Sequence, residues 1–237
     1  MAAGEKPHAR DGAPFVPPSR GAWTPDAIRE GMRLYAVTDS AWLHGRTLAE
    51  CVRQAIAGGA TFVQLREKNL STDEIVVLAR TILPVCREAG VPFVIDDDVE
   101  AALASGADGV HVGQSDVACA EARRTLGPDA IVGVSAQTVE QAKAAQAAGA
   151  DYLGVGALIP TSTKPDAVDV TREELVAICA AVDIPVVGIG GLNADTVGVL
   201  DDTGASGAAV VSALFAADDV KASARVLRSK LDRLSLR

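Results

Sequence analysis

Eight short runs of β-branched and other apolar residues constrain this chain most, because each is followed by a longer stretch rich in Ala, Glu and Arg. Runs without strict alternation of polar and apolar residues are typical of parallel strands covered on both faces. The pattern therefore predicts βα units on a parallel sheet, and hence an α/β fold. The strand candidates are Leu34–Thr38, Phe62–Arg66, Phe93–Asp96, Gly109–Val112, Ile131–Ser135, Tyr152–Ala157, Val186–Ile189 and Ala208–Ser212.

A repeat of two βα units indicates how many units the sheet contains. Gly-Ala pairs recur 43 to 55 residues apart, at Gly59-Ala60, Gly106-Ala107, Gly149-Ala150 and Gly204-Ala205. A glycine that ends a helix explains each pair alone, but four repeats of two units give eight, the number that closes a barrel of ~250 residues. We therefore predict a single (β/α)8 TIM barrel. An open doubly wound sheet is the alternative, although no G-x-G-x-x-G follows the first strand to favour it.

Capping boxes mark four helix starts, because the side chains of Ser or Thr and of Glu or Gln three residues later satisfy each other's backbone N–H groups. They are Thr47/Glu50, Ser71/Glu74, Thr138/Gln141 and Thr171/Glu174. By contrast, five of the eleven prolines fall in the first 25 residues. We therefore predict a flexible tail over residues 1–31 and one barrel domain over residues 32–237.

Charge and cysteine usage limit the partners and the compartment. With 22 basic against 31 acidic residues, the net charge of −9 argues against a broad nucleic-acid surface. No uncharged stretch reaches the ~18 apolar residues of a membrane span. The four cysteines lack zinc-like or thioredoxin-like spacing, which favours a reduced cytoplasmic protein over a disulfide framework. We expect small-molecule partners, and the possibility of a homo-oligomer stays open.

Two cations follow the second strand candidate, at the end of a barrel strand where active sites lie. The segment reads Gln64-Leu65-Arg66-Glu67-Lys68, and period-two alternation sends Gln64, Arg66 and Lys68 to one side. Such cations in an acidic protein predict an anion clamp, since Arg binds phosphate through two parallel hydrogen bonds. The alternative is that Arg66 and Lys68 pair with Glu67 or Asp73 on the rim.

Carboxylates follow the next two strands, at Asp96-Asp97-Asp98 and at Asp116. Because these carboxylates repel one another, we expect a cation between them, and oxygen ligands beside phosphate suit Mg²⁺ better than zinc. Asp97 and Asp116 are the metal candidates, whereas Asp98 is expected to cap a helix. His111, inside the fourth strand, is expected to be a hydrogen-bonded core residue.

A second anion site is indicated at the ends of the last three strands. The loop after the sixth strand contains Thr161-Ser162-Thr163-Lys164, whose hydroxyls, backbone N–H groups and ammonium suit phosphate. The seventh and eighth strands end at Gly190-Gly191 and at Val211-Ser212, and loops there form the usual phosphate site of such barrels. A tight turn with positive φ is the alternative for the glycine pair. Neither a Ser/His/Asp array nor a reactive cysteine is placed for covalent catalysis.

Motifs at the strand ends, in order between Met32 and about Ala217, resemble those of the thiamine-phosphate synthase family. They are Leu34-Tyr35-Ala36-Val37-Thr38-Asp39, Gln64-Leu65-Arg66-Glu67-Lys68, Gly109-Val110-His111-Val112-Gly113-Gln114, Val132-Gly133-Val134-Ser135, Pro160-Thr161-Ser162-Thr163-Lys164 and Ile189-Gly190-Gly191. The resemblance implies a Mg²⁺-dependent barrel enzyme that joins hydroxymethylpyrimidine diphosphate to thiazole phosphate, giving thiamine phosphate and diphosphate. In many members of the family the acceptor is a carboxylated thiazole phosphate, which loses CO2. It also implies a dissociative mechanism, in which the thiazole nitrogen captures a pyrimidine-methyl cation.

The same resemblance assigns roles to the strand-end residues. Asp97 and Asp116 would bind the metal. The catalytic groups that stabilise the departing diphosphate would be Arg66, Lys68, Ser135 and Lys164. The pyrimidine diphosphate would be held by Gln64, Leu65, Arg66, Glu67, Lys68, Asp96, Ser135 and Lys164. The thiazole phosphate would be held by Thr161, Ser162, Thr163, Gly191, Val211 and Ser212.

Two positions depart from the family pattern. Asp96 stands where Asn is usual before the metal ligand, and Gln137 stands where His is frequent. A related barrel subfamily isomerises the thiazole phosphate, and this proton transfer needs a base with a pKa of about 7. The lack of that His therefore argues against placing this chain in that subfamily. A tautomerase without metal and a non-catalytic sensor of thiamine precursors are the alternatives, and the intact metal and clamp residues argue against both.

A carboxylate at position 96 repels phosphate unless it binds the metal or is protonated, so we predict that Asp96 contacts Mg²⁺. An Asp96→Asn variant should then stay active, measured as thiamine phosphate formed from both precursors. A folded but inactive Asp96→Asn protein would show that this carboxylate has a dedicated role.

Overall fold

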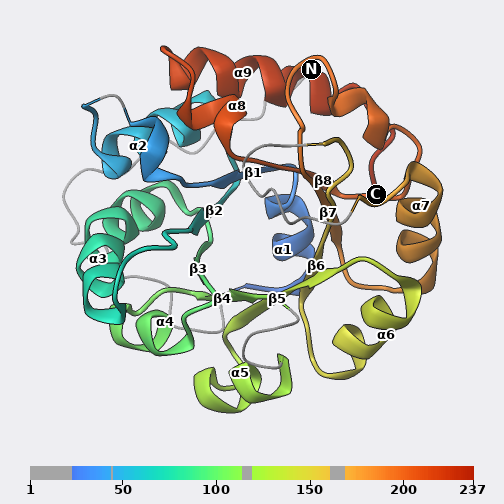
Figure 1. Ribbon diagram of the computed structural model, residues 1–237, viewed down its shortest axis with the longest axis horizontal. Helices are drawn as coiled ribbons and strands as arrows, with labels where there is room; N and C mark the ends of the chain where they lie inside the picture. Colours follow the sequence, from blue (N-terminus) through green and yellow to red (C-terminus); the bar gives the residue numbers. More distant parts are fainter. Residues whose placement is uncertain (1–22, 44, 114–118, 161–168) are drawn as a thin grey trace, which may run out of the picture.

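The computed structural model describes residues 23–43, 45–113, 119–160 and 169–237, and eight parallel strands in these ranges close into a barrel in chain order (Figure 1). The strands are β1 (Leu34–Val37), β2 (Phe62–Leu65), β3 (Phe93–Asp96), β4 (Gly109–Val112), β5 (Ile131–Ala136), β6 (Tyr152–Val155), β7 (Val186–Ile189) and β8 (Gly207–Val210). β8 pairs with β1, with Leu34 opposite Ala208, and this pairing completes the ring. The predicted (β/α)8 barrel is confirmed, and the open sheet is excluded.

Helices α2 to α9 surround the barrel (Figure 1). They are α2 (Leu48–Gly58), α3 (Thr72–Ala89), α4 (Val99–Ser105), α5 (Cys119–Leu126), α6 (Val139–Ala147), α7 (Arg172–Ala181), α8 (Ser212–Phe215) and α9 (Val220–Leu231), with 3-10 turns η1 (Ser40–Trp42) and η2 (Val197–Leu200). All four predicted capping boxes are present, at the starts of α2, α3, α6 and α7. The glycine of each Gly-Ala pair has a positive φ, and Gly59, Gly106 and Gly149 lie where α2, α4 and α6 end, as predicted. Gly204 lies in the turn that follows η2, so the prediction that it ends a helix is wrong.

The predicted tail boundary at residue 31 is wrong, because Pro25–Gly31 form helix α1. The Thr24 side chain caps this helix by accepting a hydrogen bond from Ala27 N, and Pro25 occupies its first turn, where proline is favoured. Ile28 is only 3% exposed and packs into the barrel interior. Figure 1 shows α1 across the middle of the ring, and α1 closes the end where the strands begin, since it directly precedes β1. Residues 1–22 of the predicted tail lie outside the described residues.

A separate core fills the inside of the barrel. Its buried members are Ile28, Met32, Tyr35, Val37, Phe62, Val94, Ile131, Tyr152, Val187 and Ala209. The rings of Tyr35, Phe62 and Tyr152 meet with centroids 4.5, 5.5 and 5.9 Å apart. Gly133 on β5 makes room for one of them, because a Cβ there would lie 2.1 Å from Tyr152 Cζ. The interior is therefore a packed set of aromatic and aliphatic side chains.

Two further observations concern the cysteines and the helices. All four cysteines carry free thiols and are buried. Within the described ranges, no helix combines the length and the apolar character that crossing a bilayer requires.

Gly133→Ala should destabilise the protein, because the added methyl group overlaps a ring that is fully buried. Overpacking of a tight core costs ~1–3 kcal/mol in the free energy of unfolding, measurable by urea denaturation. Gly198→Ala is the matched control, since Gly198 is exposed and a Cβ there would have no neighbour within 4 Å. Equal denaturation midpoints for the two variants would contradict the packing described for Tyr152.

Candidate active site

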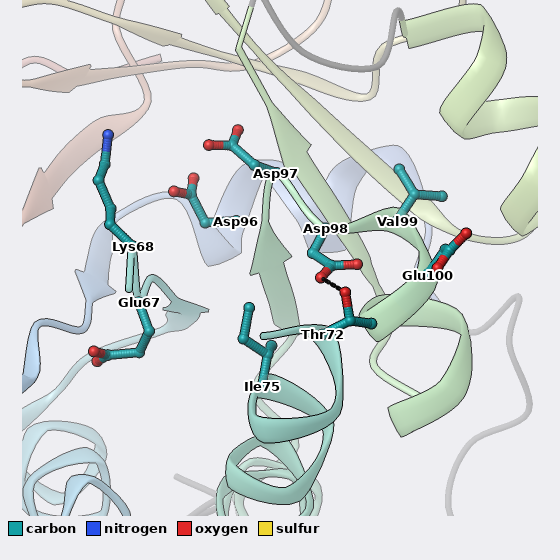
Figure 2. Close-up of a pocket in the computed structure, with 9 residues that line it drawn as sticks. All are labelled: Glu67, Lys68, Thr72, Ile75, Asp96, Asp97, Asp98, Val99 and Glu100. Carbon is teal, nitrogen blue, oxygen red and sulfur yellow. Dashed lines mark hydrogen bonds between the residues drawn. The ribbon is translucent and has the colours of Figure 1, made fainter. Parts of the chain in front are cut away.

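The ends of β2 and β3 border a pocket of about 520 Å³ at the C-terminal face of the barrel, where active sites of this fold lie. The residues that line it are Glu67, Lys68, Thr72, Ile75, Asp96, Asp97, Asp98, Val99 and Glu100. In Figure 2 the side chains of Lys68, Asp96 and Asp97 extend toward the same side of the pocket, while Glu67 turns the opposite way. The pocket thus brings an ammonium group to carboxylates of the next strand.

Gln64, Arg66 and Asp96 form one connected polar group at this mouth. Gln64 is 4% exposed, and its Nε2 donates a hydrogen bond to Asp96 Oδ1 over 3.2 Å. Arg66 Nε lies 3.6 Å from Asp96 Oδ2, and both side chains are about 15% exposed. Arg66 is therefore paired with the neighbouring strand, and the predicted alternative of Glu67 or Asp73 as its rim partner is wrong for Arg66.

Leu65 and Glu67 face the other side of the same segment. Leu65 is 1% exposed and belongs to the core between strands and helices, so only its backbone can reach a ligand. The Glu67 carboxylate accepts hydrogen bonds from Ser40 N over 3.1 Å and from Ser40 Oγ over 2.6 Å. Burial raises the pKa of Glu67, and the hydrogen bonds from Ser40 partly oppose that rise. Glu67 therefore fixes turn η1 beside β2, and its contacts lend no support to the predicted role in substrate binding.

Asp97 and Asp98 have different structural roles. Asp97 has a φ of +62°, a conformation uncommon outside glycine, and its Oδ1 accepts a hydrogen bond from Gly113 N over 3.3 Å. Its own N–H donates to the His111 carbonyl over 2.8 Å. Asp98 caps α4, as predicted, by accepting a hydrogen bond from Ala101 N over 2.7 Å. The two links to β4 and the segment that follows it hold the Asp97 carboxylate at the mouth.

The donor set after β3 fits magnesium. Asp96 and Asp97 supply carboxylate oxygens, which are hard donors, although the described ranges contain no group of three or more His, Cys, Asp or Glu side chains that could hold a metal ion. Mg²⁺ is usually bound by one or two carboxylates and completes its shell with water and substrate phosphates. Two carboxylates beside Arg66 and Lys68 therefore suit an ion that binds together with a diphosphate. Asp116, the second predicted ligand, lies outside the described residues.

Ser135, at the end of β5, is linked to the barrel interior by hydrogen bonds. Its Oγ lies 3.1 Å from His111 Nε2, and His111 Nδ1 lies 3.0 Å from the Tyr152 hydroxyl. The Tyr152 hydroxyl in turn lies 2.8 Å from that of Tyr35. The prediction that His111 is hydrogen-bonded is confirmed, but its side chain is half-buried and is not one of the buried members of the interior core. Burial raises the pKa of both tyrosines, so both phenols keep their protons at neutral pH.

Sequence reasoning missed Tyr35 and Tyr152, because an aromatic residue inside a strand indicates core packing and nothing more specific. A usable signal was the glycine on the neighbouring strand. Gly133 is directly opposite Tyr152 in the register of β5 and β6, and a glycine within a strand often marks a close approach by another group.

The ends of β7 and β8 carry the described part of the second predicted anion site. Gly190 and Gly191 have φ values of +95° and +63°, so the pair does form a turn that needs positive φ, and its binding of phosphate stays a prediction. Val211 precedes α8, which places the first N–H groups of a short helix directly after β8. The other predicted members, Thr161, Ser162, Thr163 and Lys164, lie outside the described residues.

Fold and site together define a (β/α)8-barrel enzyme with charged groups collected at the C-terminal ends of its strands. Residues 34–214 match the family model described as thiamine monophosphate synthase. The chain belongs to this family, as its strand-end motifs predicted.

Individual members of the family are similar to this chain over most of its length. The thiamine-phosphate synthase of Ruminiclostridium cellulolyticum is 52% identical over 194 residues, which cover 82% of this chain and 92% of the relative. The thiamine-phosphate synthase of Moorella thermoacetica is 48% identical over 201 residues, which cover 84% of this chain and 96% of the relative. Thiamine phosphate pyrophosphorylase from Pyrococcus furiosus, a solved structure, is similar with a TM-score of 0.80 at 38% identity and covers 86% of this chain and 98% of that one.

Glu67→Gln should stabilise the protein at neutral pH, and less so in acid. The raised pKa of Glu67 means that the folded state binds this proton more tightly than the unfolded chain does. Its stability contribution is therefore complete below the unfolded pKa and is lost as pH rises through the folded pKa. Glutamine keeps an oxygen for Ser40 without the charge, so urea denaturation should show an advantage for the variant that grows from about pH 4 to about pH 7.

Glu74→Gln is the matched control, with the opposite sign. Hydrogen bonds from the Ser71 side chain and backbone lower the pKa of Glu74. Its carboxylate therefore stabilises the folded state above the unfolded pKa, and this contribution is lost as pH falls through the folded pKa. Glu74→Gln should cost most stability at neutral pH. The same pH trend in both variants would contradict the burial effect at Glu67.

Proposed function

We propose that this chain is a thiamine-phosphate synthase, a transferase that joins 4-amino-2-methyl-5-(diphosphooxymethyl)pyrimidine to thiazole phosphate and releases diphosphate. With the carboxylated form of the thiazole phosphate as acceptor, CO2 is released as well. The observation that carries this proposal is the convergence of Arg66 and Lys68 with Asp96 and Asp97 at the ends of β2 and β3. Such a mouth suits a substrate with several negative charges that binds together with a divalent cation. Membership of the thiamine monophosphate synthase family supports it over residues 34–214.

Loss of diphosphate from the pyrimidine is the step that these residues would assist. Charge builds on the departing oxygens, and fixed cations at that place lower the barrier. Arg66, which Asp96 holds across the strand ends, and Lys68 in the same pocket provide such charges. Mg²⁺, held by Asp97 together with Asp116, would supply further neutralisation of the leaving group. The chemistry then needs positioning and charge from the chain, without a nucleophile or a strong base.

Ser135 and Lys164 would complete the diphosphate site, with Gln64 reaching the same substrate from β2. For the thiazole phosphate we propose a site formed by Thr161, Ser162, Thr163, Gly191, Val211 and Ser212. The left-handed glycine pair after β7 and the start of α8 after β8 support this, because both expose backbone N–H groups at neighbouring strand ends. The four buried free thiols support a reducing, cytoplasmic location.

One assay tests the proposed reaction. The purified protein is given both phosphorylated precursors, with Mg²⁺ or with a chelator, and thiamine phosphate and diphosphate are measured. Both products in equal amounts, formed only with the metal, are expected. Tautomerisation of the thiazole phosphate without metal would assign an isomerase instead, and precursor binding without turnover would indicate a sensor.

Asp97→Asn should raise the Mg²⁺ concentration needed for half-maximal activity at least tenfold. Asparagine tolerates positive φ nearly as well as aspartate, so the backbone at φ +62° survives while the anionic ligand is lost. Asp98→Asn removes the same charge one residue away, at a helix cap where asparagine is equally good. We expect its Mg²⁺ dependence to match the wild type. If activity depended on Mg²⁺ concentration in the same way in both variants, Asp97 would not be a metal ligand.

A further inference from the structure

Four side chains form a hydrogen-bonded chain from the closed interior of the barrel to its mouth. Tyr35 on β1, Tyr152 on β6, His111 on β4 and Ser135 on β5 are joined by contacts of 2.8, 3.0 and 3.1 Å. Hydroxyls and a neutral imidazole can each donate and accept, so the protons in such a chain can point in either of two directions. The direction decides whether Ser135 donates to His111 or accepts from it.

Tyr35 fixes this direction because it is the buried end of the chain. Its side chain is 2% exposed among apolar residues of the interior core, and within the described ranges Tyr152 is the one hydrogen-bond partner recorded for its hydroxyl. If Ser135 started the chain, the Tyr35 proton would be buried without an acceptor, which is strongly disfavoured. If Tyr35 starts the chain, the Tyr35, Tyr152 and His111 protons each have an acceptor, and the proton left over is that of Ser135 at the mouth.

The rings have little freedom to escape this arrangement. A Cβ on Gly133 would lie 2.1 Å from Tyr152 Cζ, and a Cβ on Gly154 would lie 3.1 Å from His111 Cε1. Both rings therefore stand directly against the backbone of β5 and β6. Each nitrogen of His111 faces a fixed partner, Tyr152 on one side and Ser135 on the other.

We propose that Tyr35 and Tyr152 hold neutral His111 in its Nε2–H tautomer, so that His111 donates to Ser135 Oγ and Ser135 directs its own proton to a second acceptor at the mouth. Tyr152 and His111 are then positioning residues that act through Ser135. The inference rests on the proposed function, in which Ser135 contacts the diphosphate. A serine that donates stabilises an oxygen on which charge builds, whereas one whose proton is used by His111 presents only lone pairs there.

The tautomer can be observed directly, without substrate or metal, by long-range ¹H–¹⁵N spectra of the histidine rings. The chain has three histidines, His8, His44 and His111, and loss of one signal set in His111→Gln assigns the ring of interest. We expect the neutral Nε2–H pattern in the wild type. An Nδ1–H or doubly protonated His111 ring would overturn the proposal, even if the enzyme makes thiamine phosphate.

Two phenylalanine variants form a matched pair, since each deletes one buried hydroxyl. Tyr152→Phe removes the donor to Nδ1, so the Nε2–H pattern should give way to a mixture of tautomers. Tyr35→Phe should keep the pattern, because Tyr152 then becomes the buried end and still donates to His111. The same ring spectrum in both variants would overturn the proposal, whereas a general loss of structure would show in circular dichroism.

Kinetics test whether the chain acts through Ser135. Tyr152→Phe should lower kcat about tenfold, on the order of one hydrogen bond, with a smaller change in KM for the pyrimidine diphosphate. In a protein that already carries Ser135→Ala, Tyr152→Phe should lower kcat little further, because the hydroxyl through which Tyr152 acts is already absent. If the double variant instead showed the product of the two single-variant losses in kcat, the proposal would be overturned. If the protein makes no thiamine phosphate at all, the proposed function fails while the tautomer spectra still decide the hydrogen-bond direction.

Discussion

Pairing of β8 with β1 is the interaction on which the rest of the structure depends, because it turns eight parallel strands into a closed ring. Closure gives all strands one common end, so segments far apart in the chain reach the same mouth. The contacts of the site then fall between neighbours in the ring. Arg66 meets Asp96 from β2 to β3, and His111 meets Ser135 from β4 to β5. Strand order therefore decides which functional groups can touch.

The closed ring also separates two kinds of polar group. Inward positions at the mouth carry charged and polar groups that pair with one another, as at Gln64, Arg66 and Asp96. Deeper inward positions carry Tyr35 and Tyr152, which are hydrogen-bonded to each other within a core of apolar side chains, and half-buried His111, which is hydrogen-bonded to Tyr152. The deep group is connected to the mouth through Ser135. The filling of the barrel is thus connected to the strand ends by the contact between His111 and Ser135.

The fold could be predicted from the sequence because its signals are local. Strand composition, capping boxes and helix-ending glycines each act within a few residues, and together they gave the correct number of units. Helix α1 was missed because Pro25 at a helix start looks like the prolines of a tail until Thr24 and Ile28 are seen to cap and bury it. For the site, alternation placed Gln64 and Arg66 on one side, but partners on other strands, such as Ser40 for Glu67, depend on register that no local pattern contains.

Helix α1 plugs one end of the barrel with Ile28 and the aromatic residues above it. Ligands therefore enter and leave at the other end of the barrel. Both substrates and both products of a synthase with this fold use that one opening. A product that dissociates slowly blocks binding of the next substrate. Order of entry and departure becomes a property of the architecture, set by which of the two anion sites lies nearer the opening.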